Sequence, residues 1–224
     1  MAGFELIKTD DGSWTLKSDL HGELYHSRHG AIQESRHVFI KNGLHAWLNN
    51  NSAPLSILEI GFGTGLNAFL TFLECKELNL HITYTALEAH PVPPVVYEEL
   101  EYPFLLKVPQ HADLFLRMHS SPWGVPQNLD PVFVLEKREI SFEQISDQEQ
   151  FDIIYMDAFA PTAQPQFWEN PFISQLYNAL KQGGILSTYC AKGSFKRALK
   201  EAGFKVVAVP GPPGKREMTT AYKI

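Results

Sequence analysis

Residues 55–67 read LSILEIGFGTGLN, an apolar run followed at once by three closely spaced glycines. The aliphatic run at 55–60 predicts a buried strand, because apolar and β-branched residues pack well inside a sheet. Gly61, Gly63 and Gly65 stand where the backbone must turn tightly, and a helix is predicted directly after them. A strand, a glycine turn and a helix in this order predict an α/β fold in which the turn approaches a ligand.

The same alternation of short apolar runs and longer amphipathic stretches continues along the chain, which predicts a sheet wound with helices. Strands are predicted at 55–60, 82–88, 131–136, 151–157, 184–190, 204–209 and 217–223. Helices are predicted at 64–74, 95–106, 112–119, 171–181 and 194–202. The linker PGPPG at 210–214 is too short for a crossover helix, so we expect one antiparallel strand at the end of a parallel sheet.

Residues 1–50 follow another pattern, and we interpret them as a small N-terminal cap on the Rossmann-like domain of residues 51–224. Apolar residues in the first half of the cap predict a hairpin, and a helix is predicted at 33–47. The hairpin residues are Trp14, Leu16, Leu24 and Tyr25. The cap is expected to belong to the same folding unit as the domain.

The chain has 224 residues, of which 44% are hydrophobic, and this is enough for one α/β domain with a sizeable core. It contains no uncharged apolar run of the roughly 18 to 20 residues that span a bilayer. Its first residues also lack the layout of a signal peptide. We therefore expect a soluble, cytoplasmic protein without a membrane partner. Its oligomeric state is not set by the sequence, and a monomer is the working expectation.

Potential metal ligands are few and poorly spaced. Cys75 and Cys190 lie far apart, in a predicted helix and a predicted strand, which favours buried reduced thiols over a disulfide or a zinc site. Histidines near the N-terminus have spacings that place no set of ligands on one helical face. These are His21, His26, His29 and His37. We expect no metal site.

Charge is distributed unevenly along the chain, although the formal net charge is −6. Residues 181–224 hold nine Lys or Arg against two Glu, whereas the first 180 residues hold ten Lys or Arg against 23 acidic residues. A folded domain of this kind can present a basic face to a polyanion while it remains acidic overall. The alternative is a solvated helix followed by an edge strand, and charge alone does not decide between the two.

The glycine turn favours S-adenosylmethionine over a dinucleotide in two respects. Its spacing is G-x-G-x-G rather than G-x-G-x-x-G, and Glu59 stands two residues before the first glycine. An acid at that position repels a pyrophosphate but attracts the amino group of a methionine moiety. Glu88, at the end of the next predicted strand, is placed to accept both ribose hydroxyls, as an acid also does in dinucleotide-binding proteins.

The stretch FDIIYMDAFAP at 151–161 predicts a buried strand whose last carboxylate emerges at the edge where open α/β sheets bind ligands. A primary amine has a pKa of about 10 and attacks a methyl group only through its free lone pair. We predict that Asp157, with a backbone carbonyl of the next turn, accepts the hydrogens of an amine and aims that lone pair. Phe159 is then an aromatic wall, and Pro161 stiffens the turn. The alternative is a structural aspartate that caps a loop.

Five motifs occur in one order along the chain: HGAIQESRHVF at 29–39, GFGTGLN at 61–67, ALEAH at 86–90, DAFAP at 157–161 and GKREM at 214–218. Together they resemble the methyltransferase domain of the MnmC family of bifunctional tRNA-modifying proteins. The resemblance implies a class I S-adenosylmethionine-dependent methyltransferase, with a Rossmann-like seven-stranded sheet and an antiparallel last strand. It also implies methyl transfer to the primary amine of 5-aminomethyl-(2-thio)uridine at the tRNA wobble position, giving 5-methylaminomethyl-(2-thio)uridine.

The turn chemistry and the resemblance together assign roles to single residues. Cofactor binding is assigned to Glu59, Gly61, Gly63, Gly65, Asn67, Glu88, Glu139 and Asp157, and catalysis to Asp157, Phe159 and Pro161. Glu139 is included because the family has Gly-Asp after the third strand where this chain has Arg138 and Glu139. Lys192, Lys215 and Arg216 are expected to contact the anticodon stem-loop of the tRNA. The FAD-dependent oxidase domain of the family has no counterpart in this sequence, so it resembles the standalone form, and we expect S-adenosylmethionine but no FAD.

Two other functions are compatible with parts of the sequence. The first is methyl or aminopropyl transfer to a small amine, which is favoured if the basic tail is only a solvated surface. The second is a catalytically silent module that binds RNA or a nucleotide. Such a module would not depend on Asp157 for its activity.

Overall fold

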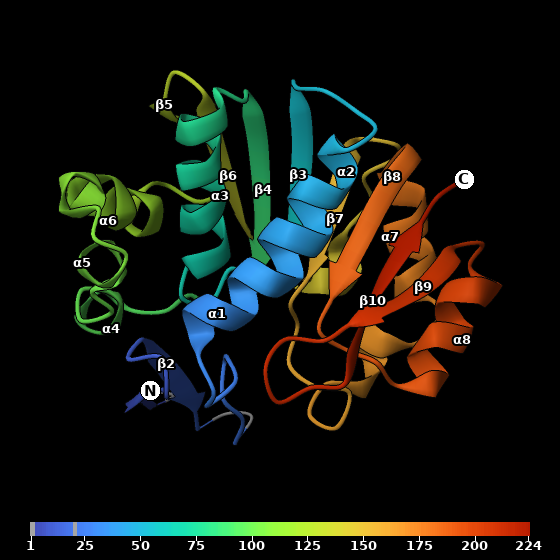
Figure 1. Ribbon diagram of the computed structural model, residues 1–224, viewed down its shortest axis with the longest axis horizontal. Helices are drawn as coiled ribbons and strands as arrows, with labels where there is room; N and C mark the ends of the chain where they lie inside the picture. The colour runs from blue at the N-terminus through green and yellow to red at the C-terminus, as the bar shows by residue number, and fades with distance from the viewer. Residues whose placement is uncertain (1–2, 20–21) are drawn as a thin grey trace.

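A sheet of eight strands in the order β5-β6-β4-β3-β7-β8-β10-β9 forms the centre of the computed structural model, which describes residues 3–19 and 22–224 (Figure 1). In chain order its strands are β3 (Leu55–Ile60), β4 (Ile82–Glu88), β5 (Gln127–Asp130), β6 (Phe133–Glu139), β7 (Phe151–Met156), β8 (Leu180–Thr188), β9 (Lys205–Pro210) and β10 (Glu217–Tyr222). The pairs from β6 to β8 are parallel, whereas β10 is antiparallel to β8 and β9. The carboxyl ends of β3, β4 and β7 therefore meet at one edge.

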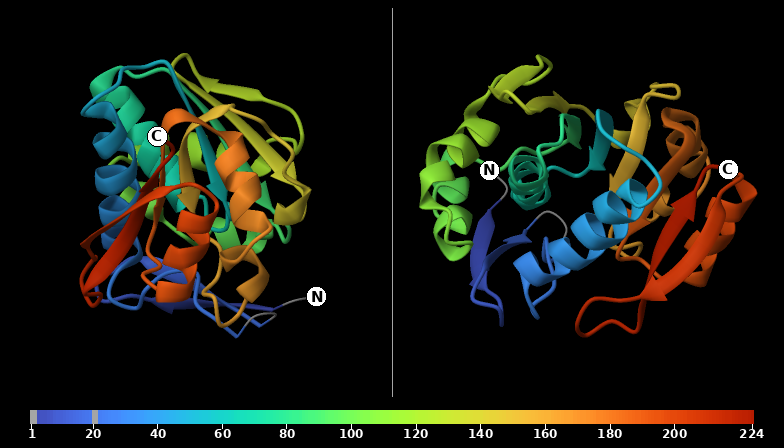
Figure 2. Two further views of the ribbon diagram at one scale, coloured as in Figure 1. Left: turned by 90° about the vertical axis from the view of Figure 1, so that its right-hand side faces the viewer. Right: turned by 45° about the horizontal axis from the view of Figure 1, so that its top comes forward.

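Helices cover both faces of this sheet (Figures 1 and 2). One face carries α1 (Ala31–Ser35), the π-helical η1 (Arg36–His45), α2 (Ala46–Leu48), α3 (Leu66–Leu78), α4 (Pro94–Tyr97), α5 (Tyr102–Leu105), η2 (Pro109–His111) and α6 (Ala112–Ser120). The other carries η3 (Phe142–Gln144), η4 (Pro165–Trp168), α7 (Phe172–Ala179) and α8 (Gly193–Glu201). In β3, Ile57 packs into the first layer and Leu58 into the second. A central strand buried on both faces has to be apolar throughout, which explains the run at 55–60.

The N-terminal helix formed by α1, η1 and α2 packs directly on the sheet and shares its core. The ring centroid of Phe39 lies 5.1 Å from that of Tyr155 in β7. The hydroxyl of Ser187 in β8 donates to the carbonyl oxygen of Val38 over 2.7 Å. One apolar cluster contains Leu16, Val38 and Phe39 together with Ile57 of the sheet. We propose that residues 1–50 fold as a cap integrated into the unit formed by residues 51–224.

All seven predicted strands are present in the described residues, with ends that differ by up to four residues, and the antiparallel last strand is confirmed. The strand β5 was not predicted from its sequence. Its residues QNLD are mostly polar, and its antiparallel pairing with β6 is interrupted between Asn128 and Asp130. A short, irregular edge strand of this kind lacks the alternation of apolar and polar residues by which strands are predicted.

The position predicted for the last strand is wrong. The strand β10 does not lie at the end of the sheet but between β8 and β9, so β9 forms the edge. The PGPPG linker turns the chain back so that β10 pairs with β9 on one side. Its other side is left to pair with β8, from Thr219 opposite Thr188 to Tyr222 opposite Ile185.

The predicted helix at 95–106 is wrong as a single helix, because the short helices α4 and α5 replace it. Glu101 between them adopts a φ of 52°, and Pro103 lies in the first turn of α5, where its missing N–H is tolerated. The predicted hairpin at 14–25 is also wrong in its pairing. The strand β2 (Trp14–Ser18) pairs with β1 (Phe4–Lys8), and Leu24 forms only an isolated bridge with Lys17.

The thiols of Cys75 and Cys190 are both buried and free. His21 lies outside the described residues. Within residues 3–19 and 22–224, no group of three or more His, Cys, Asp or Glu side chains is placed to hold a metal ion. In that same part of the chain, no helix combines the length and the apolar character needed to cross a bilayer.

The shared core predicts that truncating Phe39, which is 1% exposed, destabilises the whole domain. Phe39→Ala is expected to lower the free energy of unfolding by about 3–5 kcal/mol, because it leaves a cavity between the N-terminal helix and β7. Urea unfolding at equilibrium measures this. The control is Lys41→Ala at an exposed position of η1, which should change stability by less than about 0.5 kcal/mol. Equal, small effects of both variants would contradict a shared core.

Candidate active site

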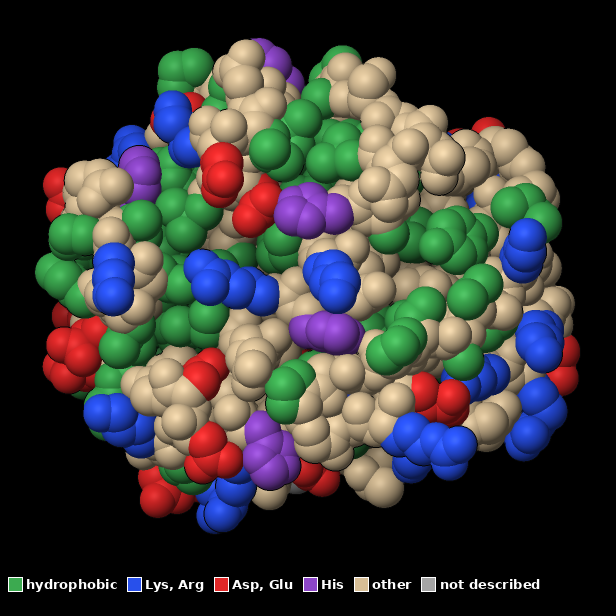
Figure 3. Space-filling model, viewed as in Figure 1, with side chains coloured by type: hydrophobic (Ala, Val, Ile, Leu, Met, Phe, Trp, Pro, Cys, Tyr) green, Lys and Arg blue, Asp and Glu red, His purple; other side chains and the backbone are tan. Residues whose placement is uncertain are grey.

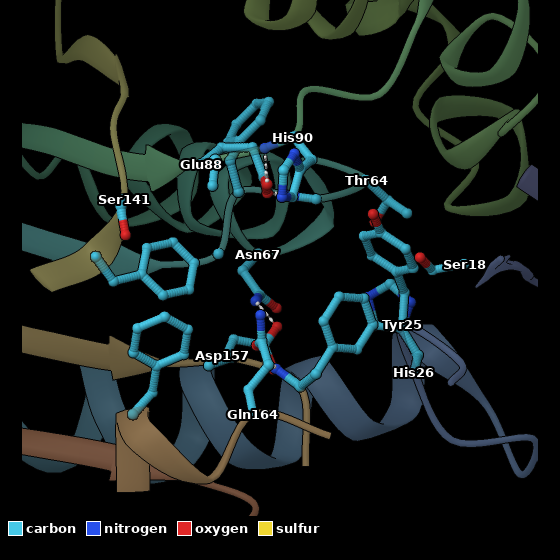
Figure 4. A pocket seen from close by; sticks show the side chains of 18 of the residues that line it. Ser18, Tyr25, His26, Thr64, Asn67, Glu88, His90, Ser141, Asp157 and Gln164 are labelled. Atoms are coloured by element: carbon cyan, nitrogen blue, oxygen red, sulfur yellow. Dashed lines mark hydrogen bonds between the residues drawn. The ribbon is translucent and has the colours of Figure 1, made fainter. Parts of the chain in front are cut away.

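A cavity of about 270 Å³ opens at the carboxyl ends of β3, β4 and β7 (Figure 4). Its walls come from the glycine turn, from residues 88–90 after β4, from residues 141–143 after β6, and from the loop after β7. Tyr25 and His26 of the N-terminal segment close the remaining side. The cavity thus lies at the edge where parallel sheets of this kind bind their ligands.

Two glycines of the turn are required by close contacts on either side. Gly61 has a φ of 96°, and a Cβ atom there would lie 2.9 Å from the carbonyl oxygen of Asp157. Gly63 has a φ of 49°, and a Cβ atom there would lie 2.9 Å from the ring of Tyr25. A side chain is disfavoured at both positions by the positive φ and by the lack of space. The tight turn predicted from the G-x-G-x-G spacing is confirmed.

Glu88 faces the cavity from the end of β4 and is held by backbone groups. One carboxylate oxygen accepts the N–H of Gly63 over 2.9 Å, and the other accepts the N–H of His90 over 2.8 Å. Burial raises the pKa of Glu88, and these hydrogen bonds from the backbone oppose that effect. Each oxygen keeps a further lone pair, so the carboxylate is oriented and still able to accept hydroxyl groups.

Asn67, in the first turn of α3, joins two carboxylates. Its Nδ2 donates to Glu59 Oε1 over 2.9 Å and to Asp157 Oδ2 over 2.8 Å, and Figure 4 shows Asn67 and Asp157 side by side in the cavity wall. Glu59 is 0% exposed and does not line the cavity, whereas Asn67 and Asp157 do. Glu59, for which a direct ligand contact was predicted from its position before the turn, is thus separated from the cavity and linked to its wall by Asn67.

The two carboxyl groups are electrostatically unusual. Burial raises the pKa of Glu59 well above its usual range, and the nearby charge of Asp157 adds to this effect. Burial likewise raises the pKa of Asp157, while the hydrogen bond from Asn67 opposes the shift. A carboxylate with a raised pKa is a stronger base than one in water, which suits it to take a proton from a substrate.

The loop after β7 presents Asp157, Phe159 and Gln164 to the cavity. The Tyr189 hydroxyl donates to the carbonyl oxygen of Ala158, and the Trp168 indole N–H donates to that of Phe159, both over 2.8 Å. Each of these backbone carbonyl oxygens accepts one hydrogen bond and keeps a further lone pair. Gln164 Oε1 accepts the N–H of Phe159 over 3.1 Å and lies in the cavity wall, so the loop offers one more acceptor besides the backbone carbonyl predicted for that purpose.

Phe159 forms the predicted aromatic wall together with Tyr25, since the two rings meet edge to face with centroids 4.9 Å apart. Pro161 is not among the residues that line the cavity. The sequence analysis missed Tyr25 and Gln164 as site residues. In the sequence, Gln164 could be recognised only by its position, because it lies in the loop directly after the DAFAP motif.

Glu139, one of the acids expected to bind the cofactor, does not lie in the cavity wall. Glu139 is exposed at the end of β6, opposite Glu88 in the register, and does not line the cavity. Ser141, Phe142 and Glu143 line it instead, and the hydroxyl of Ser141 donates to the carboxylate of Glu143. Sequence spacing alone cannot distinguish the last residue of a strand from the turn that follows it.

The three cations assigned to tRNA differ in their surroundings. Lys192 and Arg216 are exposed, as expected for phosphate contacts. The Lys215 ammonium instead lies 2.5 Å from Glu34 Oε1 and 4.2 Å from the centroid of the Tyr189 ring. Lys and Arg side chains gather on the side of the molecule formed by α8 and β9 (Figure 3). The basic character of the C-terminal tail is therefore real at the surface, but Lys215 points inward.

The cavity walls fit a ligand that carries an amino group and a pair of hydroxyl groups. Asn67 Oδ1 is buried and has no hydrogen-bond partner within the described residues. Asn67 lines the same cavity as Asp157 and Glu88, so side chains that can accept hydrogen bonds come there from three elements. The apolar ring of Phe142 and the backbone of Gly63 complete a surface suited to a nucleoside.

Residues 132–224 match the family model described as S-adenosyl-L-methionine-dependent methyltransferase. The match runs from just before β6 to the end of the chain and includes Asp157 and its loop. The fold is that of a class I S-adenosylmethionine-dependent methyltransferase, to which the additional edge strand β5 is joined.

Two curated relatives and one crystal structure extend this match over the whole chain. The tRNA 5-methylaminomethyl-2-thiouridine biosynthesis bifunctional protein MnmC of Idiomarina loihiensis is 29% identical over 75% of this chain and 29% of the relative. The protein of the same name from Aromatoleum aromaticum is 30% identical over 95% of this chain and 34% of the relative. The chain thus spans about a third of the length of these relatives. The crystal structure of MnmC2 from Aquifex aeolicus is 26% identical with a TM-score of 0.75, over 99% of this chain and 71% of that chain.

Burial of Glu59 predicts a pH-dependent stability. Because its pKa is raised in the folded state, folded Glu59 keeps its proton at pH values where the unfolded chain has lost it, so the free energy of unfolding falls as the pH rises above about 4.3. Glu59→Gln removes this titration. The stability of the variant relative to the wild type should rise as the pH increases above about 4.3, by up to about 1.4 kcal/mol per pH unit.

Urea unfolding at a series of pH values measures this difference. The matched control is Glu77→Gln, which removes an exposed acid from the same region of the chain, near the end of α3. The difference in the free energy of unfolding between Glu59→Gln and the wild type could instead stay constant with pH, as in the control. That result would mean that Glu59 is ionised in the folded protein at neutral pH.

Proposed function

We propose that this protein transfers a methyl group from S-adenosylmethionine to the primary amine of 5-aminomethyl-(2-thio)uridine at the wobble position of tRNA. The product is 5-methylaminomethyl-(2-thio)uridine. The single observation that carries the proposal is the half-buried carboxylate of Asp157, which lines a nucleoside-sized cavity in a methyltransferase fold. The similarity to proteins named for 5-methylaminomethyl-2-thiouridine biosynthesis supports the choice of acceptor.

Glu88, Asn67 and residues 141–143 would hold the cofactor. Glu88 is oriented to accept ribose hydroxyls, and Asn67 Oδ1 with the Asp157 carboxylate can receive an amino group. Ser141, Phe142 and Glu143 line the part of the wall that suits an adenine ring. When bound, S-adenosylmethionine supplies an electrophilic methyl group on a sulfonium centre. Methyl transfer leaves the oxidation state of the acceptor nitrogen unchanged, so the proposed reaction needs no FAD.

Asp157 would act as the base for the acceptor amine. Its Oδ2 is held by Asn67, which leaves Oδ1 for the amine. An alkylammonium with a pKa of about 10 must lose a proton before it can attack, and a carboxylate with a raised pKa accepts that proton more readily than one in water. Gln164 Oε1 offers a second acceptor for an amine hydrogen, and the Tyr25 and Phe159 rings exclude water.

The tRNA would approach across the basic side of the molecule. Lys192 lies at the N-terminus of α8, and Arg216 lies in the loop before β10, so both follow strands that end near the cavity edge. Exposed cations at these positions can contact phosphates of the anticodon stem-loop and fix its orientation without reading its sequence. The wobble base would then have to leave its stack to place its aminomethyl group beside Asp157.

Methyl transfer from labelled S-adenosylmethionine to tRNA that lacks the modification tests the proposal. Asp157→Asn is expected to lower the rate about 10²- to 10⁴-fold, because it removes the base but preserves the shape of the site. Binding of S-adenosylhomocysteine, measured by calorimetry, should persist, because the asparagine side chain keeps one oxygen for the amino group and Asn67 Oδ1 supplies a second acceptor. The matched control is Asp152→Asn on the same strand, where the carboxylate binds Lys181 away from the cavity.

Unchanged methylation by Asp157→Asn would refute the catalytic assignment. Methylation of free amines without methylation of tRNA would instead favour a small-molecule methyltransferase. Binding of tRNA without any methyl transfer by the wild type would favour a catalytically silent module.

The exposed positions of Lys192 and Arg216 predict that each contributes to the salt dependence of tRNA binding. Arg216→Gln and Lys192→Gln should each weaken binding of an anticodon stem-loop and reduce the slope of log affinity against log salt by about 1. Fluorescence anisotropy over a range of salt concentrations measures both quantities. Lys76→Gln on α3, whose ammonium is paired with Asp130, should leave the slope unchanged. Equal slopes in all variants would remove Lys192 and Arg216 from the RNA contact surface.

A further inference from the structure

Two of the five sequence motifs, at 29–39 and 214–218, meet beside the cavity although neither contributes a residue to its wall. Lys215 donates to Glu34 Oε1 over 2.5 Å, across 181 residues of sequence. A Cβ atom on Gly214 would lie 2.4 Å from the ring of His29, and His37 Nε2 lies 2.8 Å from the carbonyl oxygen of Pro210. The N-terminal segment and the loop between β9 and β10 are therefore joined by a continuous set of contacts.

In the pair formed by Lys215 and Glu34, the carboxylate is largely buried and the lysine is half-buried. Their side chains are 35% and 10% exposed. The other oxygen of Glu34 accepts the N–H of Ser27 over 2.7 Å, and the Lys215 ammonium also lies over the Tyr189 ring, with 4.2 Å to its centroid. A cation held in this way by a carboxylate and an aromatic face has little freedom to reach a phosphate.

The same lysine is connected to the reacting carboxylate through Tyr189. The Tyr189 hydroxyl donates to the carbonyl oxygen of Ala158, the residue after Asp157. Tyr189 also packs against Trp168, whose indole N–H holds the carbonyl oxygen of Phe159. Lys215 therefore contacts the ring that fixes the DAFAP loop. It also contributes to the charge around Asp157, whose pKa is raised mainly by burial and lowered by the Asn67 hydrogen bond, with Glu34 raising it and Lys215 lowering it further.

We propose that Lys215 is a positioning residue of the acceptor site, which it serves by joining Glu34 of the cap to Tyr189 beneath the DAFAP loop. This ion pair keeps the segment that follows Tyr25 in place, so that the Tyr25 ring meets Phe159 over the acceptor side of the cavity. Lys215 therefore orders the groups that orient the amine, and it is not a phosphate contact. The inference rests on the proposed function for the identity of the acceptor, whereas the contacts themselves do not depend on it.

The proposal predicts that alignment of the acceptor amine and affinity for the cofactor depend on different contacts. The Glu88 side of the cavity is held by β4 and the glycine turn, which Lys215 does not touch. Loss of the ion pair should therefore disturb the alignment of the amine but leave cofactor affinity unchanged. A small misplacement of reacting groups can cost about 100-fold in rate.

Steady-state methylation of undermodified tRNA by four variants tests whether loss of the ion pair lowers kcat without changing cofactor affinity. Lys215→Met removes the charge but keeps the length of the side chain, and it should lower kcat about 10- to 100-fold with little change in the Kd for S-adenosylhomocysteine. Glu34→Gln should act in the same direction. The double variant should be no worse than the more impaired single variant, because both changes break the same contact. Lys215→Arg keeps a cation over the tyrosine ring and should recover most of the lost rate.

Lys41→Met is the matched control, since it removes an exposed cation from the N-terminal helix at a position that does not line the cavity. It should leave both kcat and the KM for tRNA unchanged. The inference is overturned if Lys215→Met behaves like this control, or if Lys215→Arg is as impaired as Lys215→Met while both variants remain folded.

Amide hydrogen exchange gives a readout that does not depend on activity. Lys215→Met should increase exchange in residues 22–36 and 157–164, while exchange in β3 and β4 stays as in the wild type. If the wild type does not methylate tRNA but this pattern is found, the proposed function fails and the ion pair retains its structural role. If the wild type is active and exchange in those segments is unchanged, the inference fails and the proposed function stands.

Discussion

One side-chain amide, that of Asn67, holds the site together. Its Nδ2 donates both to Glu59 at the end of β3 and to Asp157 after β7, and Asn67 itself lies in the first turn of α3. Two carboxyl groups removed from water require such a partner, because a buried charge without one is costly. The shared donor therefore sets the spacing between two neighbouring strands and the helix that follows the glycine turn. The cavity and the direction of Asp157 depend on that spacing.

The acceptor side of the site depends on both ends of the chain. The N-terminal segment contributes the Tyr25 ring, and the loop before the last strand contributes the lysine that is bonded to Glu34. Because the N-terminal helix shares the core of the sheet, this segment is anchored on rigid structure rather than on a separate cap. The Glu88 carboxylate on the cofactor side, by contrast, is held by backbone N–H groups of the glycine turn and of His90 after β4. The two halves of the proposed reaction therefore depend on different parts of the fold.

The sequence predicted the central strands and the carboxylates at their ends because buried parallel strands read as continuous apolar runs that stop abruptly. It did not predict β5, whose polar edge carries no such signal, or the shift from Glu139 to Ser141 and Glu143 at the end of β6. Lys215 was predicted to contact tRNA, and its ion pair with Glu34 was not foreseen, since a charge count along the chain cannot show a partner 181 residues away. The roles of Asp157, Glu88 and Asn67 in binding and catalysis stay predictions that the geometry supports.

The central claim is that the cavity beside Asp157 methylates the exocyclic amine of a wobble uridine. Purified protein is incubated with methyl-labelled S-adenosylmethionine and tRNA that carries 5-aminomethyl-(2-thio)uridine, and the nucleosides are then identified by mass spectrometry. The account predicts that the label is found on the amine nitrogen, in 5-methylaminomethyl-(2-thio)uridine. Label in any other nucleoside, or in free amines but not in tRNA, would contradict it.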